Sequence, residues 1–268
     1  MLITENDPAI HDLRRRLDEF YSKTTSYDAF QTPPSYEGPW GIVRSAVEQV
    51  TQTSGRCRVL EFGAGLSNFG LHVKDLRDRL ELTAQDVTDR NQAFLLERGD
   101  KFHAGTLLDL RGPYDVIFST YVWEHVSDPQ RTLSHLLSML APGGSLFLFC
   151  PRYDMPGYFP PSARHLPPIK RLALGARLAM RRVAVALGGK PAFIIHAEPA
   201  VLTVPWYRDA DAIHWASYWD LKRALPAGYV MTPVGEGATT IKRRVLDRLL
   251  KIGVQITKPG EAKGLPRT

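Results

Sequence analysis

The sequence predicts an α/β fold in which a mostly parallel β-sheet is covered by helices on both faces. Between residues 58 and 149, short apolar runs that suit buried strands alternate with segments of helical periodicity, and this alternation is typical of parallel sheets. The first apolar run leads directly into a glycine-rich turn, which marks the passage from a strand to a helix. Of the 268 residues, 44% are hydrophobic and 23% are charged. This composition indicates a globular chain with one substantial core.

The expected helices and strands follow one another in a regular order. Before the first strand, apolar residues at helical spacing predict helices over residues 8–20 and 40–50, the former starting at Asp7 and Pro8. The order that then follows is strand 58–62, a helix to about residue 80, strand 82–85, helix 92–97, strand 102–104, strand 115–119, helix 129–140 and strand 145–149. A return to the sheet is indicated later by helix 218–225, strand 228–231, a basic helix 241–252 and strand 254–257.

The bulk composition argues against secretion, membrane spanning and a disulfide framework. The amino terminus carries acids where a signal peptide needs an apolar run, and no uncharged stretch approaches the roughly 20 apolar residues of a spanning helix. The two cysteines, Cys57 and Cys150, lack the spacing of metal ligands. We therefore expect a cytoplasmic protein with reduced thiols and no metal site.

The glycine-rich turn reads Glu61-Phe62-Gly63-Ala64-Gly65-Leu66-Ser67-Asn68. Its glycines allow a tight turn and a close approach of the backbone to a ligand. A nicotinamide dinucleotide would require a further glycine at Asn68, and the Glu61 carboxylate would repel its pyrophosphate. A carboxylate at this position instead suits the ammonium group of a cationic ligand.

Two further positions follow the next strands. Asp86 stands at the carboxyl end of the second strand, where an acid can accept hydrogen bonds from both ribose hydroxyls of an adenosine; a helix cap is the alternative reading. Gly105 and Thr106 follow the third strand where an adenine edge would lie, with Leu107 able to pack on the ring, although a plain turn is an equal alternative.

Three blocks of the sequence, VLEFGAGLSNFG, TAQDVT and YDVIFSTYVWEHVSDPQRTLSHLLSMLAPGGSLFLFCP, resemble the class I S-adenosylmethionine (SAM)-dependent methyltransferases that act on small molecules, quinone precursors and sugars. The resemblance spans about residues 58–152, with a fainter return at 214–231. It implies a Rossmann-like fold with a seven-stranded sheet, the last strand antiparallel, a helical insertion after the fifth strand, and SAM lying across the carboxyl ends of the first strands.

The resemblance also implies a set of cofactor-binding residues. The family commonly has an acid where Thr106 stands, so recognition of adenine is where this chain departs from the pattern. By position, the residues around the methionine part would be Glu61, Gly63 and Gly65, the ribose would be held by Asp86, the adenine would be flanked by Thr106 and Leu107, and Ser119 and Thr120 would pass beneath the sulfonium.

The pattern of elements and the resemblance together suggest five parts of the chain. They are an N-terminal helical cap (1–55), a SAM-binding core (56–152), an insertion contributing to the acceptor site (153–213), a C-terminal return to the sheet (214–257) and a flexible tail (258–268).

Methyl transfer to an alcohol requires removal of a proton, and a neighbouring histidine or carboxylate usually accepts it. The candidates are His125, His165, His214 and Asp211. His125 follows the fourth strand near the expected methyl position, although Glu-His pairs in this family often shape the loop. His165 follows the fifth strand, where the acceptor-binding segment of related enzymes begins; His103 and His196 are interpreted as structural.

The segment 206–215, which contains His214 and Asp211, combines aromatic rings with acids. Aromatic faces beside carboxylates are typical of carbohydrate sites, and a loop packed by its own aromatics is an even alternative.

The insertion is basic and contains an amphipathic helix. From Met155 to Ala197 there is no acidic residue, and the net charge of the chain is +6. The apolar residues of an expected helix over 169–187 form one stripe, with basic residues on the far side: Ile169, Leu172, Ala176, Met180, Val183 and Leu187, with Lys170, Arg177 and Arg181. Such a helix could lie on an anionic membrane, or bury its stripe as a lid or in a homodimer. No motif accompanies the charge to indicate nucleic-acid binding.

These observations lead to one preferred function and three rivals. We expect a SAM-dependent methyltransferase that acts on a hydroxyl or similar nucleophile of a small or lipid-linked acceptor. Analogy with the family favours a saccharide of surface-polysaccharide assembly, with the enzyme peripheral at the inner face of the membrane. The rivals are O- or C-methylation of a quinone or aromatic metabolite, a catalytically silent SAM-binding assembly module, and a nicotinamide-dependent oxidoreductase, which Asn68 and Glu61 disfavour.

Overall fold

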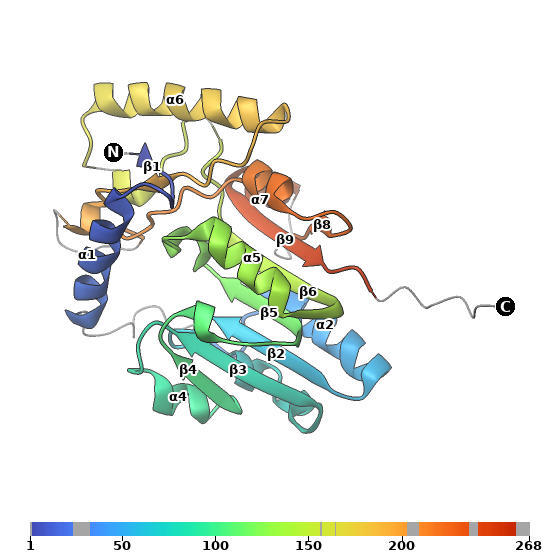
Figure 1. Ribbon diagram of the computed structural model, residues 1–268. Coiled ribbons are helices and arrows are strands. Elements are labelled where there is room, and N and C mark those ends of the chain that lie inside the picture. Colours follow the sequence, from blue (N-terminus) through green and yellow to red (C-terminus); the bar gives the residue numbers. More distant parts are fainter. Residues whose placement is uncertain are drawn as a thin grey trace.

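The computed structural model describes residues 2–23, 33–155, 157–163, 165–202, 209–235 and 241–260, with the backbone alone for 241–244. Within these residues, seven strands form one sheet in the order β4-β3-β2-β5-β6-β9-β8 (Figure 1). The strands are β2 (Cys57–Phe62), β3 (Leu80–Asp86), β4 (Lys101–Ala104), β5 (Tyr114–Thr120), β6 (Leu140–Pro151), β8 (Val230–Pro233) and β9 (Lys251–Thr257). The pairs from β4 to β6 are parallel, and β9 is antiparallel to both of its neighbours. The predicted fold class is confirmed.

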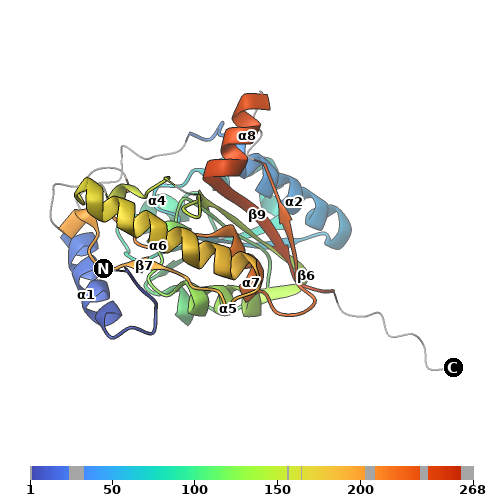
Figure 2. The same cartoon turned by 90° about the horizontal axis from the view of Figure 1, so that it is seen from above.

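Helices cover both faces of this sheet because successive residues of its strands point to opposite sides. In β6, Leu146 and Leu148 pack toward α5 (Pro129–Met139) and α7 (Tyr218–Ala224). Phe147 and Phe149, which alternate with them, pack toward α2 (Gly38–Ser54) and its Trp40. Figure 2 shows α2 and α5 on opposite sides of the strands.

The remaining elements around the sheet are short. The predicted helix to residue 80 is wrong as a single helix: it is divided at Val73, which leaves helical geometry with φ −109°. The short elements are α3 (Phe69–His72), α4 (Gln92–Leu96), α8 (Ile241–Leu250) and the 3₁₀ turns η2 (Lys74–Arg79), η3 (Leu107–Asp109), η4 (Trp123–His125), η5 (Pro161–Ala163) and η6 (Ala200–Leu202).

A second layer combines residues 2–23 at the amino terminus with the insertion after β6 (153–213), and we call these two segments together the cap. Strand β1 (Leu2–Ile3) pairs antiparallel with β7 (Ile195–His196). Helix α1 (Ala9–Lys23), whose first turn is capped by Asp7, packs its apolar side on β7 and on Ile213. Thus α1 belongs with the insertion, while α2 belongs with the sheet. The division of the chain into five parts stays a prediction.

The longest helix of the cap, α6 (Pro168–Ala186), is anchored by a buried ion pair. Arg182 donates to the Asp220 carboxylate at 2.8 Å and to the Trp215 carbonyl at 2.5 Å. Asp220 also accepts from the Ala192 amide at 2.9 Å. Both charged side chains are almost completely buried, and together they fix one face of α6 on α7.

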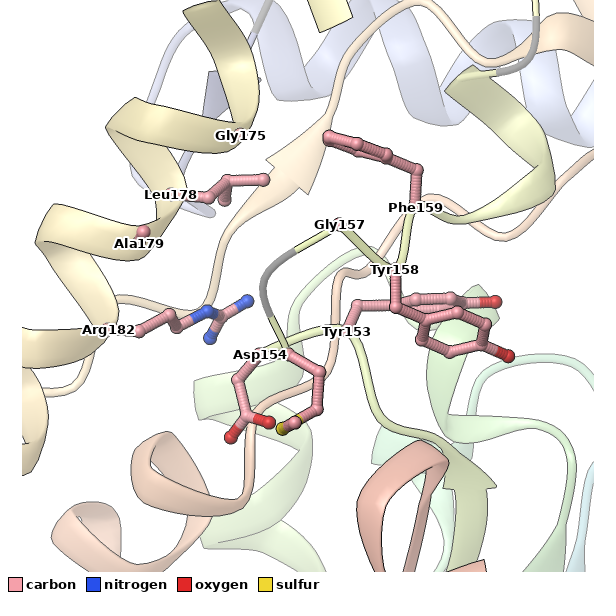
Figure 3. Close-up of a pocket in the computed structure, with 10 residues that line it drawn as sticks. Tyr153, Asp154, Gly157, Tyr158, Phe159, Gly175, Leu178, Ala179 and Arg182 are labelled. Atoms are coloured by element: carbon pink, nitrogen blue, oxygen red, sulfur yellow. The ribbon is translucent and has the colours of Figure 1, made fainter. Parts of the chain in front are cut away.

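A small pocket lies at this joint, between α6 and the segment that follows β6 (Figure 3). It is lined by Asp154 and Arg182, among others, and its volume of about 10 Å³ leaves room for a single water. Asp154 accepts from the Ser217 hydroxyl at 3.1 Å and from the Tyr218 amide at 3.0 Å. The pocket is therefore part of the connection between insertion and sheet and is too small for an organic ligand.

Arg182→Met should destabilise the protein by about 3–5 kcal/mol, because it keeps the apolar bulk but leaves the Asp220 charge buried without its partner. Chemical denaturation measures this change. Arg177→Met on the exposed side of the same helix is the matched control and should change stability by less than about 0.5 kcal/mol. Equal stability of the two variants would contradict the anchoring role of Arg182.

Candidate functional site

The turn after β2 touches the segment after β5. Gly63 has φ +65°, and a Cβ at this position would lie 2.3 Å from Cγ1 of Val122. Gly65 has φ +53°, with open space where its side chain would be. Glycine is therefore required at residue 63 both for conformation and for space, and its absence of a side chain brings the two loops together.

Hydrogen bonds from the end of β3 hold the neighbouring turns in place. The Gly63 amide donates to Oε1 of Gln85 at 3.2 Å, and Nε2 of Gln85 donates to the Gly105 carbonyl at 2.8 Å. The Gly65 amide donates to Oδ2 of Asp86 at 2.7 Å. Gln85, which is buried, thus links the turns after β2 and β4. The sequence pattern did not single out this residue, although an amide between Ala84 and Asp86 at the end of a strand was an available signal.

The carboxyl groups of Glu61 and Asp86 at this edge have raised pKa values. Burial, with a smaller contribution from the charge of the nearby Asp86, raises the pKa of the Glu61 carboxyl to about 8, although a hydrogen bond from Ser67 opposes the shift. Burial also raises the pKa of Asp86, although the amides of Gly65 and Val87 lower it. A cation bound here would favour ionisation of Glu61.

The other predicted cofactor residues lie along the same edge. Thr106 is exposed, and its hydroxyl accepts from the Leu108 amide at 3.3 Å, which starts η3. Leu107 packs against the core beside α5. Ser119 is fully buried, and its hydroxyl has no partner within the described residues. Thr120 ends β5. The roles of these residues in binding stay predictions.

A cluster of ionisable groups begins at η4, directly after β5. Glu124 is fully buried and, within the part of the chain that the structure describes, both of its carboxyl oxygens lack a hydrogen-bond partner. Nδ1 of His125 lies 3.3 Å from Oδ2 of Asp211, which also accepts from the Tyr21 hydroxyl at 2.8 Å. Residues from α1, η4 and the end of the insertion therefore meet at one point.

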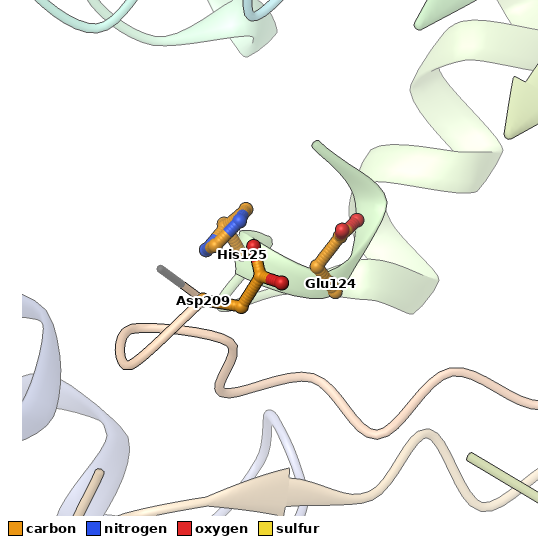
Figure 4. Close-up of side chains that lie close together, drawn as sticks. All are labelled: Glu124, His125 and Asp209. Atoms are coloured by element: carbon orange, nitrogen blue, oxygen red, sulfur yellow. The ribbon is translucent and has the colours of Figure 1, made fainter. Parts of the chain in front are cut away.

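Asp209 completes this cluster. Glu124, His125 and Asp209 each offer one ligand atom, and the three atoms lie within 4.8 Å of one another. Figure 4 shows the first two side chains on η4 and Asp209 on the loop that faces them. One nitrogen and two carboxylate oxygens could hold a divalent cation or pass a proton between them.

The pKa values within the cluster reflect its burial. Burial raises the pKa of Glu124 to about 7. Burial by itself lowers the pKa of His125, but Asp211, Glu124 and Asp209 outweigh it and leave the pKa raised. Near neutral pH the two groups are therefore coupled, because ionisation of Glu124 favours the protonated form of His125 and protonation of His125 favours the ionised form of Glu124.

A family model described as a methyltransferase domain matches residues 10–221 of the chain. The chain belongs to the SAM-dependent methyltransferases. The resemblance found in the sequence is confirmed, and the match extends over most of the cap and over the strands from β2 to β6.

Individual relatives are distant. The chain is 33% identical to an uncharacterized protein from Synechococcus sp. over an alignment 131 residues long. The alignment covers 44% of this chain and 31% of that protein. This chain spans less than a third of the length of the curated relatives it matches.

Solved structures share the fold of the methyltransferase. The plantazolicin methyltransferase BpumL, in complex with a triazolic desmethylPZN analog and SAH, has a TM-score of 0.55 at 12% identity, covering 96% of this chain and 100% of that chain. A SAM-dependent methyltransferase from Mesorhizobium loti has a TM-score of 0.50 at 17% identity, covering 84% and 98%. At such identities, the likeness concerns the fold alone.

Of the four catalytic candidates, the structure brings His125 and Asp211 together. The side chains of the other two, His214 and His165, have other neighbours. His214 is fully buried; its Nδ1 lies 2.9 Å from the Trp123 carbonyl, and burial lowers its pKa to about 3. Such a ring is a poor proton acceptor at neutral pH. His165 is exposed, and its ring stacks on that of His196 at 6.2 Å. Catalytic roles for both stay predictions.

The predicted carbohydrate-like segment is only partly described. Trp206 and Tyr207 lie outside the described residues, and Trp215 is fully buried among the side chains of the cap. Among the described residues of this segment, Asp209 and Asp211 lie in the cluster beside His125.

Glu124→Gln should remove part of the pH dependence of stability. The folded state holds a proton on Glu124 up to about pH 7, whereas the unfolded chain loses it near its ordinary value of 4.5. The folded state therefore binds more protons between these values, and stability falls as the pH rises through them. Between pH 4 and pH 8, the free energy of unfolding should therefore shift in favour of the variant over the wild type by up to about 3 kcal/mol. Denaturation curves at both pH values measure the gain, and an equal effect at both would contradict the buried neutral carboxyl.

Proposed function

We propose that this chain transfers a methyl group from SAM to a hydroxyl or similar nucleophile of a small or lipid-linked acceptor, with His125 as the base. The observation that carries the proposal is the contact of Gly63 with Val122. It brings the turn predicted to bind the cofactor next to Val122, which precedes Glu124 and His125 by two and three residues.

The residues at the sheet edge fit SAM. When bound, SAM supplies a methyl group on a positively charged sulfur. Glu61 offers a buried carboxyl to a cationic group, Gly65 leaves open space beside its backbone, and Asp86 has carboxylate lone pairs left for ribose hydroxyls. The buried Ser119 hydroxyl, which lacks a protein partner within the described residues, offers one more hydrogen bond. The SAH held by BpumL, which shares the fold, supports this choice of cofactor.

His125 has the surroundings of a general base. The Asp211 carboxylate faces its Nδ1 and favours the tautomer with the proton on that atom. Nε2 then has a lone pair with which to accept the proton of an acceptor hydroxyl. Tyr21 donates to the same carboxylate and fixes its direction. His125 would thus remove the proton while the surrounding acids stabilise the imidazolium that forms.

A saccharide is our preferred acceptor class. Sugar hydroxyls need hydrogen-bond acceptors, and Asp209 and Asp211 supply carboxylate oxygens beside His125. A quinone or other aromatic metabolite, which is the alternative, would be better served by an apolar lining. A role in surface-polysaccharide assembly extends this preference by analogy with the family.

The affinity for SAM should increase as the pH rises from 6 to 8. Glu61 must lose its proton to pair with a cation, and the pKa of its carboxyl is about 8 in the free protein. The gain should approach about tenfold per pH unit at most, with a proton released on binding. Calorimetric titration in two buffers of different ionisation enthalpy measures both quantities.

Glu61→Gln should weaken binding and abolish this pH dependence, whereas Glu97→Gln, at an exposed carboxylate, should bind as wild type. Tight but pH-independent binding would refute the role of Glu61, and absence of any SAM binding would favour a degenerate module.

His125→Asn should lower turnover by about 100-fold or more while SAM affinity stays within about twofold, because a base acts on the acceptor and not on the cofactor. Asp211→Asn should cost about 10- to 100-fold, since it only orients the ring. Release of SAH in the presence of saccharide and aromatic acceptors is the measurement, with His11→Asn on the exposed side of α1 as control.

A chelator distinguishes the two uses of the cluster. Turnover that EDTA abolishes and Mg²⁺ or Mn²⁺ restores would assign Glu124, His125 and Asp209 to a metal ion and overturn His125 as base. Turnover that is insensitive to EDTA is the result we expect.

A further inference from the structure

The outer face of α6 is apolar and exposed. Leu187, just beyond its last residue, has 83% of its surface exposed, and Ile169 and Leu172 have 73% and 70%. Ala173, Ala176 and Ala184 lie exposed between the large side chains. The large apolar residues of this face are Ile169, Leu172, Met180, Val183 and Leu187.

These side chains cannot turn inward, because the opposite side of α6 is fixed. Leu178, Arg182 and Val185 are buried there, and Arg182 is bonded to Asp220 and Trp215. Arg223 donates to the carbonyls of Val185 and Ala186 at the carboxyl end of the helix. The apolar stripe predicted from the sequence therefore exists, but it faces away from the protein. Helix α1 offers a contrast, since its apolar stripe is buried on β7.

The charge beside this face is of one sign. Lys170 and Arg177 are exposed on one flank, and Arg181 is partly exposed with them. No acidic residue occurs from Met155 to Ala197. The face thus combines an apolar strip with a positive border, a combination that suits the boundary between headgroups and acyl chains of an anionic bilayer.

The position of α6 allows it to lie flat on a surface. Its 19 residues span about 28 Å, and it runs along the outer edge of the cap, away from the sheet (Figures 1 and 2). Among the described residues, no helix is long and apolar enough to cross a membrane, so contact in the plane of the surface is the geometry available to it.

We propose that the outer face of α6 docks the protein onto an anionic lipid bilayer. A second copy of the chain is the less suitable occupant, because two such faces would bring basic borders together without acids to neutralise them. Docking depends on α6 alone and holds whether or not the chain transfers methyl groups. If the acceptor is lipid-linked, docking would bring the enzyme to the membrane surface that carries this acceptor.

Co-sedimentation of the full chain with vesicles tests the proposal. Vesicles of phosphatidylcholine with phosphatidylglycerol should bind the protein, phosphatidylcholine alone should bind it at least about tenfold more weakly, and high salt should release it. Leu172→Ser combined with Met180→Ser should reduce binding by about tenfold or more, and so should Lys170→Glu combined with Arg177→Glu.

The matched control combines Val230→Ser with Arg56→Glu, an exposed apolar and an exposed basic residue outside the cap, and should bind as wild type. The thermal unfolding midpoint and SAM titration should be unchanged in the α6 variants, which separates a loss of docking from a loss of fold or cofactor. Wild-type protein that does not bind anionic vesicles would overturn the proposal. Variants of α6 that bind vesicles like wild type would also overturn it. A third contrary outcome is a wild-type dimer in light scattering that the serine substitutions dissociate, with no vesicle binding by either protein.

Discussion

The absence of a side chain at Gly63 is the constraint on which the site depends. Because Val122 occupies the space where a Cβ would lie, the turn after β2 and the segment after β5 meet directly. Gln85 then ties the first of these turns to the one after β4. Three loops at the carboxyl edge of the sheet are thereby set relative to one another by one steric contact and one amide side chain. The groups that we assign to the cofactor, and Glu124 and His125 beside them, lie on or next to these loops, whereas Asp209 and Asp211 reach the cluster from the insertion.

Glu61 and Glu124 are both buried near this edge, in surroundings that disfavour the ionised carboxylate. Burial raises the pKa of both Glu61 and Glu124, and it outweighs the hydrogen bond from Ser67 that lowers the first and the neighbouring His125 that lowers the second. Perturbed carboxyls of this kind gather at functional sites more often than elsewhere. A buried carboxyl such as Glu61 suits a cationic ligand, whereas Glu124 lies beside His125 and raises the pKa of its imidazole.

The sequence was informative where structure is local. The succession of strands and helices along the chain, the glycine turn and the place of Asp86 at the end of a strand could be predicted because strand, turn and helix signals lie within a few residues of each other. The bond between Tyr21 and Asp211 joins residues 190 positions apart, and no pattern of either segment specifies it. Likewise the pairing of β1 with β7 involves two residues from each, too few to show periodicity. The apolar stripe of α6 was visible as a spacing, but the side it faces is decided by the pair of Arg182 and Asp220, which only the folded chain reveals.

The pairing of β1 with β7 has a consequence for how the chain folds. The sheet from β2 to β6 is made of neighbours in sequence, and its contacts can form soon after those residues leave the ribosome. The cap instead needs residues 2–3 to find residues 195–196, a long loop whose closure is slow. The strands from β2 to β6 should therefore pair before the cap closes, and the cluster around His125 should form late, because Tyr21 must wait for Asp211 to be synthesised.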